Sequence, residues 1–121
     1  MIRSGIINEP IARKENSIIE RCISPLGQNA ITHYKVLKEF ENYSMVECKL
    51  ETGRTHQIRV HMAHISHPLL GDSLYNTTSD VRTLIDRQAL HSYIMEFIHP
   101  VSKNKLILEA DIPEDIKKLI I

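Results

Sequence analysis

The sequence has 121 residues, 42% of them hydrophobic and 25% charged, a profile typical of one ordinary soluble domain. Lys plus Arg and Asp plus Glu number 15 each, so the zero net charge excludes a global basic field, and any contact with nucleic acid must come from a local patch. The two cysteines form neither a zinc ribbon nor a redox motif. No run of about 18 apolar residues predicts a membrane span, so we expect no membrane association and a cytoplasmic location.

The first third of the chain predicts short strands joined by turns. Residues 1–17 are irregular and apolar and could supply one edge strand, because Pro10 lacks the N–H that a central strand requires. Residues 21–30 are rich in turn formers and predict a turn. This turn leads into a strand over about 31–38.

A second strand that ends at Glu51 has the clearest pattern. Strict alternation from Ser44 puts Val46 and Cys48 on one side of the pleat, with charged residues on the other. The short connection over 39–43 predicts that this strand and the preceding one are antiparallel neighbours.

A helix is predicted next, over residues 55–65. Ile58, Met62 and Ile65 recur at helical spacing. Thr55 stands where an N-cap residue would accept a backbone N–H. We expect the apolar stripe to face the core.

The remainder predicts a loop with one helical turn over 76–87, then a strand over 89–98 with apolar residues on both faces, which places it inside the sheet. A partner strand over 106–110 and a short helix from Pro113 follow. Together these elements predict one α+β domain over 1–121, with four or five mostly antiparallel strands and two or three short helices.

The turn at Gly53 is the first candidate site. A tight strand-to-helix turn directs free backbone N–H groups and the side chain of Arg54 toward whatever lies above the helix start. This arrangement suits a phosphate or a carboxylate. The alternative is a helix that is merely capped.

Four histidines crowd into this region, at His56, His61, His64 and His67. His61 and His64 could share a helical face, but His56 faces elsewhere and no Asp or Glu within the helix completes a common ligand set. We therefore expect no metal and no cofactor, and histidines that cap, pack or hydrogen-bond. A metal-dependent hydrolase built on this cluster is a further alternative.

Arg59 borders the predicted buried stripe, one residue past Ile58 and three before Met62. An unpaired, desolvated guanidinium would cost several kcal/mol, on the order expected for buried charges. We therefore expect it to meet a carboxylate or a phosphate. The structural alternative is a salt bridge to Glu51 or Asp72 that only holds the turn.

A longer string around this turn is more specific. Residues 50–62 have the sequence Leu-Glu-Thr-Gly-Arg-Thr-His-Gln-Ile-Arg-Val-His-Met, residues 67–72 have His-Pro-Leu-Leu-Gly-Asp, and Tyr75 follows. These residues closely resemble the third motif of the RluA-type (RluD-like) RNA pseudouridine synthases, and the similarity runs from about residue 5 to the C-terminus. The resemblance implies isomerisation of uridine to pseudouridine in RNA, expected to be ribosomal RNA, without a cofactor or metal.

The resemblance also implies roles for individual residues. The arginine at Arg59 would pair with a catalytic aspartate. Leu90 would line the pocket for the target base, although a leucine is more often a core residue. The turn would form the RNA-facing cleft, with the RNA-binding residues Arg54, Thr55, His56 and Gln57.

The family's aspartate lies in a His-Arg-Leu-Asp-x-x-Thr-Ser-Gly motif that has no counterpart in the 121 residues. We therefore expect the C-terminal half of a catalytic domain, inactive alone, with Arg59 lacking its aspartate. Its sheet should expose an edge that favours self-association or pairing with an N-terminal half. The alternative is a non-catalytic RNA-binding module that uses the Arg54 turn.

Overall fold

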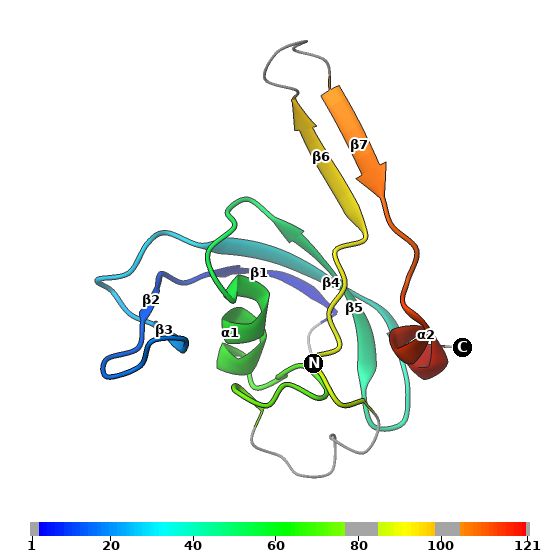
Figure 1. Cartoon of the computed structure of the whole chain (residues 1–121), viewed down its shortest axis with the longest axis horizontal. Coiled ribbons are helices and arrows are strands. Elements are labelled where there is room, and N and C mark those ends of the chain that lie inside the picture. The colour runs from blue at the N-terminus through cyan, green and yellow to red at the C-terminus, as the bar shows by residue number, and fades with distance from the viewer. Residues whose placement is uncertain (1–2, 77–84, 99–104, 121) are drawn as a thin grey trace. The chain divides into compact units, whose positions relative to one another are not determined.

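The computed structural model describes residues 3–76, 85–98 and 105–120 (Figure 1). They form two compact units, Met1–Gln88 and Ala89–Ile121. Most of the loop predicted over 76–87, and the turn predicted after residue 100, lie outside the described residues. In the part that is described, neither helix is long and apolar enough to cross a bilayer.

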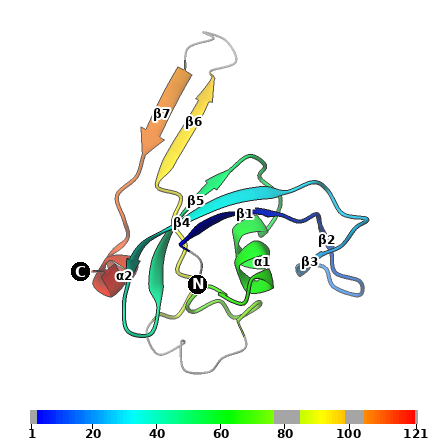
Figure 2. The ribbon, with the colours of Figure 1, turned by 180° about the vertical axis from the view of Figure 1, so that it is seen from behind.

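The first unit is built on an antiparallel sheet in the order β1-β4-β5, whose strands are β1 (Ser4–Asn8), β4 (Ile31–Glu39) and β5 (Ser44–Leu50). Figure 2 shows the long β4 between the other two. The predicted strands over 31–38 and up to Glu51 are confirmed as antiparallel neighbours. Their direction follows from the short connection between them. Tyr34 lies opposite Cys48 in this register. Burial raises the pKa of the Cys48 thiol to about 11.

A small hairpin precedes β4. It pairs β2 (Ile11–Arg13) with β3 (Arg21–Ile23) in a separate two-stranded sheet. The edge strand predicted before residue 17 is confirmed as β1, and the turn predicted over 21–30 is confirmed after residue 23. The strands β2 and β3 were not predicted. Each hairpin strand is three residues long, too short for alternation to be recognised.

Helix α1 (Gln57–His64) packs against β3 and β4, as both views show (Figures 1 and 2). The helix begins two residues later than predicted. Its buried residues are Gln57, Val60, His61 and Met62. The predicted stripe of Ile58, Met62 and Ile65 is therefore wrong except at Met62, because two polar side chains occupy the inner face and find partners there.

The core of this unit joins the hairpin to the helix. Ile11, Ala30 and Val60 form a buried cluster, and Ile23 and Tyr75 pack against it. At about 25 cal/mol per Å² of apolar surface removed from water, such contacts dominate the stability of a small unit. They also fix the hairpin beside the helix start.

The second unit contains the hairpin β6 (Ile94–Ile98) and β7 (Lys105–Glu109), followed by α2 (Glu114–Ile120). The predicted hairpin and terminal helix are confirmed. The strand expected from residue 89 begins only at Ile94, and among the described residues β6 pairs with β7 alone, not inside a larger sheet. All pairings described are antiparallel, so the α+β prediction is confirmed.

Candidate functional site

The turn before α1 is held by Gln57. The side-chain oxygen of Gln57 accepts hydrogen bonds from the Thr52 hydroxyl (2.7 Å) and the Arg54 N–H (3.0 Å). Its amide nitrogen donates to Ile31 O and to Thr32 Oγ1, each at 3.0 Å. Because Gln57 is only 3% exposed, its side chain belongs to the scaffold of the turn.

The N-cap position is held by His56, and Thr55 is exposed, so the predicted N-cap is wrong. The His56 backbone is left-handed, with φ 57° and ψ 21°, and its side chain makes no capping bond. This conformation costs a non-glycine residue about 1–2 kcal/mol. Non-glycine residues held in it are often found at functional sites.

The ring of His56 is fixed by Tyr75. His56 Nδ1 lies 2.7 Å from the Tyr75 hydroxyl, and that hydroxyl accepts the Arg21 backbone N–H at 2.9 Å. Burial, then the charges of Arg59 and Arg21, lowers the pKa of His56. The lowered pKa favours a neutral imidazole in this hydrogen bond.

Arg59 is paired within the chain. Its Nε and Nη2 donate to Asp72 Oδ2 and Oδ1, both at 2.8 Å, and its Cζ lies 5.1 Å from the centre of the Tyr75 ring. Asp72 Oδ1 also accepts the N–H groups of Leu74 and Tyr75. Burial alone would raise the pKa of Asp72, but these hydrogen bonds together lower it. The expectation that Arg59 would meet a carboxylate is confirmed, and the partner is Asp72, as in the structural alternative. A tight internal pair of this kind weakens the assignment of Arg59 to a catalytic aspartate.

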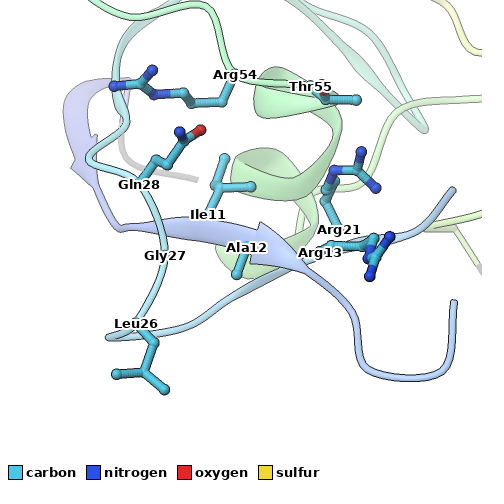
Figure 3. Close-up of a pocket in the computed structure, with 9 residues that line it drawn as sticks. All are labelled: Ile11, Ala12, Arg13, Arg21, Leu26, Gly27, Gln28, Arg54 and Thr55. Atoms are coloured by element: carbon cyan, nitrogen blue, oxygen red, sulfur yellow. The ribbon is translucent and has the colours of Figure 1, made fainter. Parts of the chain in front are cut away.

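Arg54 has a different environment. Its Nε donates to Asn29 O at 2.8 Å, and within the described residues neither Nη atom has a hydrogen-bond partner. Arg54 and Thr55 line an open groove of about 310 Å³, which Figure 3 shows. We call it the arginine groove; its lining residues are Ile11, Ala12, Arg13, Arg21, Leu26, Gly27, Gln28, Arg54 and Thr55.

Sequence reasoning missed Arg13 and Arg21 in this groove. They are opposite one another in the register of β2 and β3, and only recognition of the hairpin could have revealed that pairing. Of the predicted RNA-binding residues, Arg54 and Thr55 line the groove, while His56 and Gln57 support the turn behind it.

The histidine cluster does not converge. His61 is fully buried, with Nδ1 2.7 Å from Thr32 Oγ1 and Nε2 2.9 Å from Glu9 O. Both ring nitrogens are therefore used. His64 and His67 are exposed. Among the residues that the structure describes, no three His, Cys, Asp or Glu side chains are grouped as a metal site.

Leu90 lies in the second unit, in a segment without regular structure before β6, and is partly exposed. Its predicted place in a strand is wrong. Its role in a base pocket stays a prediction.

Known proteins resemble this chain along almost its whole length. Residues 1–64 match the family model of RNA pseudouridylate synthases. An uncharacterized RNA pseudouridine synthase of Bacillus subtilis, YjbO, is 48% identical over 116 residues, covering 96% of this chain and 40% of that relative. Ribosomal large subunit pseudouridine synthase D of Escherichia coli is 40% identical over 131 residues, covering 99% of this chain and 40% of that relative.

The fold has a solved counterpart. Human RNA Pseudouridylate Synthase Domain Containing 1 superposes with a TM-score of 0.75 at 26% identity, over 90% of this chain and 48% of that one. The chain belongs to the RNA pseudouridylate synthase family. Its relatives include ribosomal synthases of the D type, so the RluA-type, RluD-like resemblance is confirmed. The chain spans about 40% of the length of these curated relatives.

Proposed function

We propose that this chain is the C-terminal part of the catalytic domain of an RNA pseudouridine synthase, acting in the cytoplasm on uridine in ribosomal RNA. Membership of the family supports the reaction, and the name of the E. coli relative, a ribosomal large subunit pseudouridine synthase, supports the substrate class. The observation that carries the proposal is the turn at Gly53 and Arg54, in which the Arg54 Nη atoms have no partner among the described residues and Arg54 lines an open groove.

The aspartate next to Arg59 is not available as a nucleophile. Asp72 is fully buried and both its oxygens bind Arg59, so its carboxylate is committed to that pair. An attacking carboxylate needs access to the uridine, which must leave its stack to react. We propose that the catalytic aspartate is supplied by a segment that carries the family's aspartate motif.

Arg59 still has a donor group that could bind the catalytic aspartate. Asp72 uses its Nε and Nη2, and among the described residues its Nη1 has no hydrogen-bond partner. One guanidinium offers five N–H donors, so it can bind two carboxylates. We propose that Asp72 orients Arg59 and that Nη1 meets the catalytic aspartate, while Leu90 lines the pocket for the base.

The sheet offers places for the N-terminal half to join. β1 and β5 each pair only with β4 among the described residues, and unpaired strand edges favour pairing with another strand. We propose that one of these edges pairs with the N-terminal half, or with a second copy of the chain when that half is absent.

A tritium-release assay on RNA with 5-tritiated uridine tests the proposal, because the new C–C bond at C5 expels the tritium. The chain is assayed alone and mixed with a segment that carries the aspartate motif. We expect release only from the mixture, and sedimentation of the mixture should show a complex. Release from the chain alone would contradict the proposed source of the nucleophile. Binding without release in the mixture would favour the RNA-binding module.

The role of Arg59 needs a matched set of variants. Arg59→Ala should abolish release but leaves Asp72 unpaired, so the double variant Arg59→Ala/Asp72→Ala removes both charges. We expect the double variant to fold and remain inactive. Arg3→Ala removes a charge from an exposed pair with Glu39 and should stay active. Activity in the double variant would show that Arg59 serves only the ion pair.

A further inference from the structure

The arginine groove carries positive charge that the described residues do not neutralise. Its lining contains three arginines and no Asp or Glu. Glu20, which directly precedes Arg21, binds Lys14 at 3.2 Å. Elsewhere Arg3 and Arg59 each have an acidic partner. In a chain of zero net charge, this local excess marks a surface for an anion.

The pairing of Arg13 with Arg21 is the strongest part of this observation. The two residues are direct cross-strand partners in the β2–β3 hairpin. Side chains at such positions start about 5 Å apart, and like charges there destabilise the pair. Arg21 Nη1 makes only long contacts of 3.3–3.5 Å with the carbonyls of residues 18–20. The guanidinium of Arg13 has no hydrogen-bond partner in the part of the chain that is described. An anion between the two guanidinium groups would remove the repulsion.

Arg54 lies at the other side of the groove. Figure 3 shows Arg54 with Gln28 on one side, Arg13 with Arg21 on the other, and Ile11 between them on β2. The groove therefore has a cation at each side and an apolar floor. This alternation fits a ribose between two phosphates.

The floor of the groove forms where the backbone at Gly27 lies close to the backbone of β2. A Cβ on Gly27 would lie 2.5 Å from the Ile11 carbonyl carbon and 2.6 Å from its oxygen. The loop and the strand are also joined by the Ile11 N–H to Gln28 O bond (2.9 Å) and its reciprocal (2.8 Å). These contacts hold the two charged sides at a fixed separation.

We propose that the arginine groove binds the backbone of the RNA substrate, with one phosphodiester between Arg13 and Arg21 and a neighbouring one at Arg54. The assignment rests on the proposed function for the identity of the anion as RNA. It adds Arg13 and Arg21, which lie outside the motif that contains Arg54, and it gives the β2–β3 hairpin a role in holding the strand.

The salt dependence of RNA affinity tests this proposal. The slope of log K against log salt changes by about 0.7 for each phosphate contact to a single strand. Binding of a fluorescent single-stranded RNA is measured by anisotropy from low to moderate salt. The double variant Arg13→Gln/Arg21→Gln should lower the slope by about 0.7, because both arginines share one phosphate, and Arg54→Gln should lower it by a similar further amount.

Two controls keep the result interpretable. Arg3→Gln removes one charge outside the groove and should leave the slope unchanged. Arg13→Lys/Arg21→Lys keeps the charge and should retain the slope, which would show that a lowered slope in the glutamine variant is not misfolding. A glutamine double variant with the slope of Arg3→Gln overturns the proposal, as does displacement of the RNA by polyglutamate at equal charge concentration.

The outcome is separable from that of the proposed function. Lowered slopes in the glutamine variants without tritium release from the mixture would support the RNA-binding groove and contradict the proposed synthase activity. Tritium release with unchanged slopes would support the synthase activity and contradict the RNA-binding groove.

Discussion

The arginines of the first unit differ in whether a carboxylate of the chain neutralises them. Arg59 is 13% exposed, bidentate to a carboxylate with no exposure, and covered by the Tyr75 ring. Arg13, Arg21 and Arg54 line an open groove without a carboxylate. All four lie within one small unit. Because the first arginine is satisfied within the chain, its loss should cost stability, whereas the others should contribute mainly to binding.

The difference shows why a motif alone does not assign a role. Arg54 and Arg59 are five residues apart in the same string, yet one is turned outward with free donors and the other is held inside. A guanidinium's partners separate structural from ligand-facing roles better than its place in the motif does.

The largest effect that would test this comparison is expected for Asp72→Ala. It leaves Arg59 without its carboxylate, and we expect a loss of about 3 kcal/mol in the free energy of unfolding, measured with urea. The matched control is Glu39→Ala, which breaks the exposed Arg3–Glu39 pair and should cost less than about 1 kcal/mol. Equal losses in the two variants would remove the distinction between buried and exposed pairs here.

An intermediate effect should appear as a pH dependence at His61. Nε2 donates to Glu9 O and Nδ1 accepts from the Thr32 hydroxyl, which in turn accepts from Gln57. Burial is the main cause of a lowered pKa at His61. The unfolded chain therefore binds the proton more readily, and the free energy of unfolding should fall as pH drops below about 6.5.

The variant His61→Gln should reduce that loss, by up to about 1 kcal/mol between pH 7.5 and 5.5. The exposed His64 supplies the control, because His64→Gln should retain the wild-type pH dependence. Urea titrations at both pH values measure the difference. An unchanged pH dependence in His61→Gln would contradict the assignment of a neutral, buried imidazole.

The smallest effect is expected in the groove. Arg13→Gln should change the free energy of unfolding by less than about 0.5 kcal/mol, or raise it, because a like-charge pair with Arg21 is relieved. Thermal unfolding of the variant beside Arg3→Gln measures this. A large destabilisation would show that Arg13, like Arg59, contributes to stability, and would contradict the difference between the two sets of arginines.

Much of the sheet could be predicted, because the sequence of β5 alternates over its seven residues and the short turn after β4 makes the two strands antiparallel. The start of α1 could not, because Gln57, which holds the turn by four hydrogen bonds, resembles any polar residue in a sequence. His61 was missed as an inner residue for the same reason: its burial depends on partners from β4 and from the segment before β2.

The candidate site was predicted in part. Arg54 was found because Gly53 and the following helix mark an anion-binding turn. Asp72 was named beforehand as a structural partner of Arg59, and the structure confirms that pairing. Arg13 and Arg21 could not be found, since their meeting depends on the register of two three-residue strands.

The close approach of Gly27 to β2 affects the shape of the arginine groove without affecting its charge. A methyl group there would meet backbone atoms of Ile11 and Ala12 at less than 3 Å, and backbone cannot turn aside as a flexible side chain does. The loop would have to shift away from β2 while every arginine kept its charge. The spacing of the two cationic sides therefore depends on Gly27, the one residue of the lining that carries no side chain.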